Sequence, residues 1–149
     1  MSAIEQLKQL REETGLSVSE CKKALDEAGG SIEKAKDILK EWGKTVARKK
    51  QERGVGAGLV VSYVHGTGKA GALIELRCET DFVARSDDFK NLGHELALQI
   101  VSMAPENTEE LLSQPYIRDT SLTARDLIQS VIAKLGENIK VERFSRFEI

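Results

Sequence analysis

Hydrophobic positions in the first forty residues recur at helical spacing, in three stretches that turn residues separate. A serine stands before each stretch, at the position of a helix N-cap: Ser2, Ser17 and Ser31. A glutamate three residues after each of the first two serines completes a capping box. Gly15 and Gly29-Gly30 mark the ends of the first two helices. The pattern predicts a three-helix bundle over residues 1–43, in which the third helix ends at Gly43.

A basic and then glycine-rich segment follows the bundle. Lysine and arginine dominate residues 44–53, where Glu52 is the single acid, and glycine alternates with small apolar residues over 54–58. This composition is typical of a solvated linker helix followed by a flexible joint. A nucleic-acid patch is the alternative, and the lack of interleaved aromatic residues argues against it. The sequence therefore predicts a linker over residues 44–57 between two folded units.

The pattern changes to that of β-strands after the linker. Residues 59–64 form a short apolar run rich in valine, and side chains in 72–78 alternate with the period of two that a half-buried strand shows. Residues 66–71 match G-x-G-x-x-G, but a dinucleotide site needs a helix after the glycines and a strand follows here. These glycines therefore predict a hairpin loop. Residues 139–149 give a third strand.

Two longer amphipathic helices lie between the second and third strands. The first has its apolar positions at helical spacing after Ser86: Phe89, Leu92, Leu96 and Ile100. The second runs from Ala124 to Leu135 and ends at Gly136, and a short helical turn is expected between Pro105 and Pro115. The sequence thus predicts an α+β fold. Its core, over residues 58–149, has three antiparallel strands and two main helices.

Composition narrows the function classes. The chain has 149 residues and a formal net charge of −2, a balance that argues against general nucleic-acid binding. No apolar run approaches the roughly 18 residues that a membrane helix needs, and no secretory leader is visible, so a cytoplasmic protein is expected. Two cysteines and two histidines lack the spacing of a zinc site. We therefore expect neither a metal nor a cofactor.

An acid stands beside an aromatic residue at the corner between the second strand and the Phe89 helix. Most aromatic side chains pack in cores, so residue chemistry alone favours a buried Phe82, with Asp81 helping to cap the helix. The alternative is a protruding aromatic group and a charge that contact a partner. A similar choice concerns Leu16 and Val18, which either close the small bundle or dock on a partner.

Three segments resemble the elongation factor Ts family, the guanine-nucleotide exchange factors of the translation GTPase elongation factor Tu. Residues 79–85 read E-T-D-F-V-A-R, the hallmark of that family. Thr14-Gly15 followed by C-K-K-A-L at 21–25, and G-E-N-I at 136–139 followed by Arg143-Phe144, resemble two further family motifs in the same order. The chain departs from the family at residues 16–19, where small residues and methionines are common.

The resemblance implies an exchange factor that releases GDP from elongation factor Tu and has no active site of its own. It also implies two contacts with that GTPase. The first contact disturbs the Mg²⁺ and GDP site through Thr80, Asp81, Phe82 and Val83. The second is made by the N-terminal bundle through Leu16, Val18 and Ser19. The nucleotide then belongs to the GTPase, so we expect no direct binding of nucleotide, nucleic acid or membrane by this chain.

The strand pattern also predicts a homodimer. Both faces of the predicted sheet are partly apolar, while one chain offers only two main helices to cover them. A second copy that shares the sheet would restore the two-half core of longer family members. Two alternatives stay open. The bundle is similar to ubiquitin-associated domains, which would make the protein an adaptor, or the chain is a dimeric scaffold without exchange activity.

Overall fold

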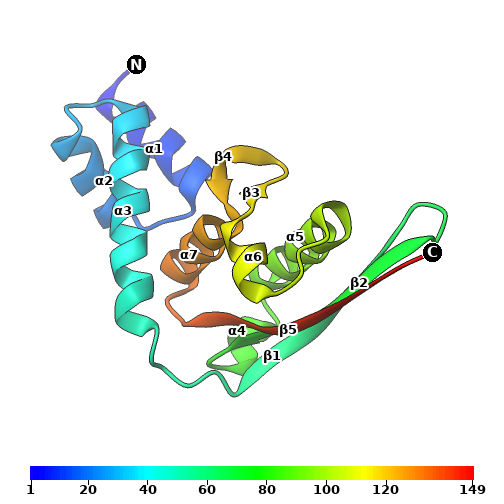
Figure 1. Cartoon of the computed structure of the whole chain (residues 1–149). Coiled ribbons are helices and arrows are strands. Elements are labelled where there is room, and N and C mark those ends of the chain that lie inside the picture. The colour runs from blue at the N-terminus through cyan, green and yellow to red at the C-terminus, as the bar shows by residue number, and fades with distance from the viewer.

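The computed structural model describes all 149 residues and contains seven helices and five strands (Figure 1). The elements are α1 (Ala3–Thr14), α2 (Val18–Glu27), α3 (Ile32–Lys50), β1 (Ala57–His65), β2 (Ala70–Cys78), α4 (Asp81–Ala84), α5 (Asp87–Met103), α6 (Thr108–Ser113), β3 (Pro115–Tyr116), β4 (Asp119–Thr123), α7 (Ala124–Leu135) and β5 (Ile139–Glu148). Helices α1, α2 and α3 lie beside the unit that the elements from β1 to β5 form. The predicted α+β fold class is confirmed.

The N-terminal bundle forms where the capping signals place it. The side chains of Ser2 and Ser17 each accept a hydrogen bond from a glutamate amide three residues later, and both capping boxes are complete. Gly15, with φ of 69°, ends α1 in the left-handed conformation that glycine adopts without strain. Six residues form the core of this bundle: Leu10, Cys21, Ala24, Leu25, Ala35 and Leu39. So small a core leaves the bundle dependent on its caps.

Helix α3 differs from the expectation at Gly43. The prediction that the third helix ends there is wrong, because α3 continues through Gly43 to Lys50. Gly43 is buried, and a Cβ atom added to it would lie 3.4 Å from the Cβ atom of Ala133 on α7. This glycine allows two helices to approach closely, and Ala47, one turn later, belongs to the main core. The division into residues 1–43, 44–57 and 58–149 stays a prediction.

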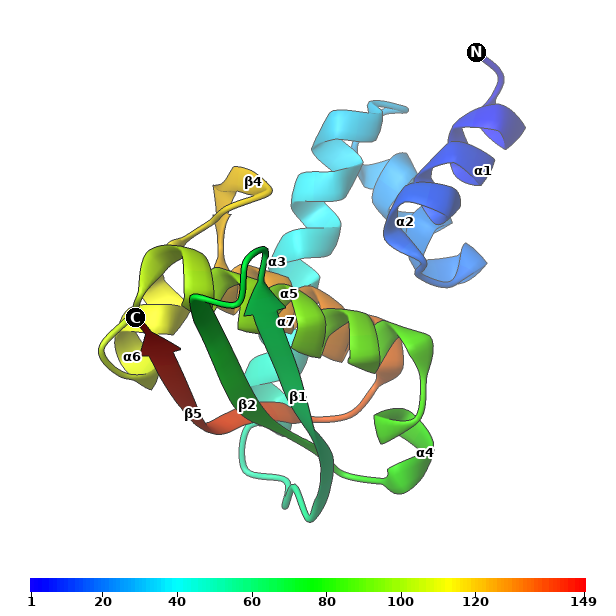
Figure 2. The same cartoon turned by 90° about the vertical axis from the view of Figure 1, so that its right-hand side faces the viewer.

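The main sheet has the antiparallel order β1-β2-β5. On its inner face Leu59 pairs with Leu76, and Val61 pairs with Ile74, which also faces Phe144 of β5. The glycine-rich run at 66–71 forms the loop and the first positions of β2, as the hairpin prediction required. Helix α5 lies against β1 and β2, and α7 adds Ile128 and Ile132 to the same core. Figure 2 looks toward the strands with these helices behind them.

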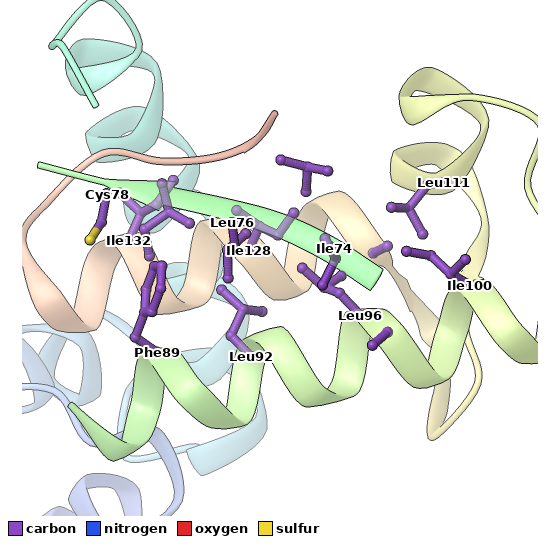
Figure 3. Close-up of a cluster of buried hydrophobic side chains, with 14 of the residues drawn as sticks. Ile74, Leu76, Cys78, Phe89, Leu92, Leu96, Ile100, Leu111, Ile128 and Ile132 are labelled. Atoms are coloured by element: carbon purple, nitrogen blue, oxygen red, sulfur yellow. The ribbon is translucent and has the colours of Figure 1, made fainter. Parts of the chain in front are cut away.

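The main core lies between β2 and these two helices. Figure 3 shows the side chains of Ile74, Leu76 and Cys78 on β2 pointing toward those of α5 and α7. Phe89, at the start of α5, is fully buried and packs beneath the C-terminal end of β2. Nineteen buried residues make up this cluster, so the sheet unit rests on a larger core than the bundle does.

A small hairpin of β3 and β4 was not predicted. It begins at Pro115 and is held against α5 by the fully buried side chain of Gln99. The Gln99 amide donates to the Pro115 carbonyl oxygen at 2.9 Å and accepts from the Ile117 amide at 2.9 Å. Because this anchor lies 16 to 18 residues away along the chain, local sequence patterns do not indicate the hairpin.

Candidate functional site

The corner that joins β2 to α5 is a one-turn helix, α4, whose first two residues are both exposed. Phe82 leaves 82% of its surface accessible, and Asp81 beside it is exposed as well. Figures 1 and 2 show α4 projecting at the end of β2, below the helices that cover the sheet. The interpretation of Phe82 as a core residue is therefore wrong. We call residues 80–85 the tip.

Two residues in the second half of α4 anchor the tip to the molecule. Val83 and Ala84 are buried in the main core. Val83, predicted as a partner contact, faces inward where Phe82 faces outward, and its packing in the core holds the turn in place. On the far side, the Ser86 hydroxyl donates to the Val83 carbonyl oxygen at 2.7 Å and also caps α5.

Thr80 begins α4 as its N-cap. Its backbone is extended, with φ of −130°, and its hydroxyl oxygen accepts a hydrogen bond from the Val83 amide at 3.3 Å. Asp81 follows in the first turn, where a carboxylate favours the helix dipole. The sequence order of cap, acid and aromatic thus fixes a turn that presents a negative charge and a large apolar ring side by side.

A second segment, the loop between α7 and β5, contacts the tip through one carboxylate. Glu137 accepts hydrogen bonds from the amides of Glu79 at 3.1 Å and Thr80 at 3.0 Å, and from the Thr80 hydroxyl at 2.8 Å. In return the Asn138 backbone amide donates to the Glu79 carboxylate at 2.6 Å. The two family-like motifs, 79–85 and 136–139, therefore meet in space and bind each other. We call the hydrogen bonds of Glu137 to Glu79 and Thr80 the Glu137 clamp.

Sequence reasoning did not assign Glu137 or Asn138 to the site. Both residues stand in the G-E-N-I segment, which served only to identify the resemblance. That segment was the available signal, because a glutamate and an asparagine directly after a helix-ending glycine are polar groups without an obvious local partner. Their partners lie 57 to 59 residues away along the chain.

Cys78 lies directly beneath the tip and is fully buried. Burial and the nearby charge of Glu137 raise the pKa of the Cys78 thiol, and the thiol donates a weak hydrogen bond to the Thr80 carbonyl oxygen at 3.2 Å. The protonated form is therefore favoured at neutral pH. Cys78 has the environment of a packing residue and lacks the exposed, low-pKa setting of a nucleophilic cysteine.

The second predicted contact lies at the start of α2. Val18 leaves 47% of its surface accessible and Ser19 is exposed, whereas Leu16 is half-buried and packs against the bundle core. Val18 lines a shallow apolar groove together with Ile4, Leu7 and Leu25. Figure 1 shows α2 at the far left of the molecule and α4 near its lower centre, and in Figure 2 α2 lies above α4. The structure thus keeps the two predicted sets of residues as separate surfaces.

The structure places no group of three or more histidine, cysteine, aspartate or glutamate residues where they could hold a metal ion. None of its helices combines the length and the hydrophobicity that crossing a membrane requires.

Comparisons with known proteins match the chain over nearly its full length. A sequence model of the family described as "Elongation factor TS" matches residues 79–149. Elongation factor Ts of Coprothermobacter proteolyticus is 45% identical in an alignment that covers 96% of this chain and 95% of the relative. The elongation factor Ts of Leptospira biflexa is 43% identical, with 97% and 96% covered. That of Fervidobacterium nodosum is 40% identical, with 96% and 95% covered.

Proposed function

The chain belongs to the elongation factor Ts family, which makes it a translation elongation factor, and we propose that it releases GDP from a GTPase of the elongation factor Tu type. The observation that carries the proposal is the exposed Phe82, 82% accessible, on a turn that the core and the Glu137 clamp hold in place. An exposed aromatic group on a fixed support is suited to insertion into a partner.

The chemistry of the partner explains what such a tip can do. A phosphate-loop GTPase holds GDP through backbone amides around the phosphates and through Mg²⁺, which carboxylate, hydroxyl and water ligands bind. Phe82 would insert between helices of the GTPase and displace this framework, while Asp81 would disturb the charge and water structure near the metal. Exchange factor and GDP then weaken each other's affinity for the GTPase by the same factor. GTP can afterwards displace the exchange factor.

We assign different roles to the residues of the two contacts. Thr80, Asp81 and Phe82 form the contact that acts on the nucleotide site, with Val83 as its anchor. Val18 and Ser19 form a docking contact on the bundle, supported from beneath by the half-buried Leu16. In this proposal the chain has no active site or cofactor, and the nucleotide and Mg²⁺ belong to the GTPase.

We also propose that two copies of the chain pair through the outer face of the main sheet. This face is turned away from α5 and α7 and carries four exposed apolar side chains: Val60, Val64, Leu73 and Phe147. At its centre Glu75 accepts hydrogen bonds from Arg143 and Arg77, which lower the pKa of Glu75 and pair its carboxylate within one chain. An apolar face whose central carboxylate is paired within its own chain is suited to a second copy of itself.

Light scattering tests the dimer at about tens of micromolar, where an interface of standard size ordinarily holds. We expect twice the mass of the chain for the natural protein and the mass of one chain for Phe147→Glu. A monomeric natural protein at these concentrations would remove the dimer from the proposal and leave the exchange activity standing.

Release of a fluorescent GDP analogue from elongation factor Tu tests the exchange activity. We expect substoichiometric amounts of the chain to accelerate release, because an exchange factor turns over. Unchanged release at a large excess of the chain would overturn the proposal. A pull-down with ubiquitin separates the adaptor alternative: retention of ubiquitin without accelerated release would favour it.

A further inference from the structure

We propose that Glu137 is a positioning residue of the tip, which fixes the orientation of Asp81 and Phe82 through Glu79 and Thr80 without contacting the GTPase. The inference rests on the proposed exchange function and adds a residue to it. Glu137 lies in the loop after α7 and is half-buried. It accepts all three hydrogen bonds that Glu79 and Thr80, the two residues before α4, donate to this loop. One carboxylate therefore determines how the chain enters the tip.

The Thr80 hydroxyl is held from both sides. It donates its hydrogen to Glu137 at 2.8 Å and accepts the Val83 amide at 3.3 Å, so its proton points to the clamp and its lone pair caps α4. A hydrogen bond to a charged acceptor is stronger than one between neutral groups. Removal of the Glu137 carboxylate leaves this hydroxyl free to rotate, and the cap that starts the Asp81-Phe82 turn loses its fixed direction.

The clamp is part of a network that also reaches the end of α3. Asn138, only 6% exposed, donates its side-chain amide to the carbonyl oxygens of Gln51 at 3.3 Å and Arg53 at 2.9 Å. Arg53 in turn lies 3.7 Å from the Glu79 carboxylate. Three segments far apart in the sequence therefore converge behind the tip. The tip is tied to the same segment that connects the core to the N-terminal bundle.

Phe82 contributes nothing to its own placement, because its ring lies outside the core. A helix of four residues is also too short to be stable by itself. Val83 and Ala84 anchor one side of the turn through packing, and the clamp holds the other side through hydrogen bonds. Without the clamp we expect the core anchor to keep the fold, while the exposed side of the turn gains freedom.

Three single variants test the proposal. Glu137→Ala removes every acceptor of the clamp, and Glu137→Gln keeps one oxygen that both backbone amides can still reach. Glu142→Ala is the matched control, because Glu142 is an exposed glutamate on β5 whose side chain makes no hydrogen bond or salt bridge. Each variant is compared with the natural chain by thermal unfolding, by amide hydrogen exchange and by GDP release from elongation factor Tu.

We expect Glu137→Ala to keep cooperative unfolding but to exchange the Glu79 and Thr80 amides faster. Its maximal rate of GDP release should fall about tenfold, equivalent to ~1.4 kcal/mol, while the half-saturating concentration changes less. The half-saturating concentration should change less than the maximal rate because the variant leaves the bundle contact intact. Glu137→Gln should recover part of the rate, and Glu142→Ala should match the natural chain in all three measurements.

The double variant Phe82→Ala with Glu137→Ala decides whether Glu137 acts through the tip. If it does, the losses of the two single variants are less than additive in the double variant, since Asp81 is then the only side chain left to position. Fully additive losses would overturn the proposal, and so would unchanged amide exchange in Glu137→Ala. A loss of activity that disappears when the variant is cooled to temperatures at which it is fully folded would also overturn the proposal, because that loss would come from reduced stability alone. If the natural chain releases no GDP, the exchange function fails, whereas the amide exchange still tests the clamp.

Discussion

The tip and the start of α2 are both capped helix N-termini at the surface, yet they are held in place differently. Ser17 caps α2 through Glu20, three residues away, and the helix packs on a core of six residues. Thr80 caps α4 and is itself held by Glu137, 57 residues away, over a core of nineteen. One surface is defined by local hydrogen bonds, and the other exists only when distant segments meet.

The difference shows how each surface can contribute to binding. The tip presents one large ring from a support that long-range contacts fix, which suits an action that depends on precise placement. The α2 surface presents the smaller Val18 from a minimal bundle, which suits docking. We therefore expect substitutions in the tip to change the rate of GDP release, and substitutions on α2 to change affinity for the GTPase.

Deletion of residues 1–43 removes one of the two surfaces entirely and should have the largest effect on affinity. The remaining chain keeps Ala47 and the whole main core, so we expect it to unfold cooperatively. Its half-saturating concentration for GDP release should rise strongly, while a measurable maximal rate remains. Calorimetry and GDP release on the truncated chain are the measurements. Loss of cooperative unfolding would show that the packing of α3 on α7 makes the two units one.

Substitution of one fully buried residue in each core tests whether the tip depends on the main core and the α2 surface on the bundle core. Phe89→Ala should cost about 3–5 kcal/mol of stability, because Phe89 is inaccessible and a cavity would remain. Leu10→Ala in the bundle should cost about 2–5 kcal/mol. Hydrogen exchange then gives the comparison: Phe89→Ala should expose the amides of α4, and Leu10→Ala should leave them protected. Equal loss of protection in both variants would contradict separate supports.

The exposed side chains of the two surfaces give a cleaner contrast, because neither substitution disturbs a core. Phe82→Ala should change stability by less than about 1 kcal/mol, as surface substitutions do. Its maximal rate of GDP release should fall tenfold for every ~1.4 kcal/mol of lost coupling. Val18→Ala should raise the half-saturating concentration and leave the maximal rate unchanged. Normal GDP release by Phe82→Ala would leave the exchange mechanism without its main residue.

The smallest expected difference lies within the tip itself. Asp81→Ala should slow GDP release, because it removes a charge that would lie near Mg²⁺ in the complex. After chelation of Mg²⁺ with EDTA this defect should shrink, whereas that of Phe82→Ala should persist, since steric displacement does not need the ion. Release rates of both variants with and without EDTA provide the measurement. An Asp81→Ala defect of equal size under both conditions would assign that side chain another role.

Local patterns predicted much of the fold correctly because their causes are local. A serine and a glutamate three residues apart satisfy each other's backbone groups wherever they occur, so the capping boxes at Ser2 and Ser17 could be read directly. Alternation along β2 placed Ile74, Leu76 and Cys78 on one face, and the structure buries all three. The G-x-G-x-x-G run was correctly assigned to a hairpin loop because a strand follows it.

Whether a residue is inside or outside, and what holds it there, was decided by the tertiary structure. Gly43 looks like a helix end in sequence, but α7 lies against it and makes it a close contact within one continuous helix. Residue chemistry favours a buried Phe82, and only the inward turn of Val83 and Ala84 leaves the ring exposed. The partners of Glu137 lie more than fifty residues away, and long-range contacts of this kind have no period or spacing that a sequence displays. The sequence by itself therefore determined most of the elements and the family, while the packing of distant segments determined the β3–β4 hairpin, the full length of α3 and the geometry of the site.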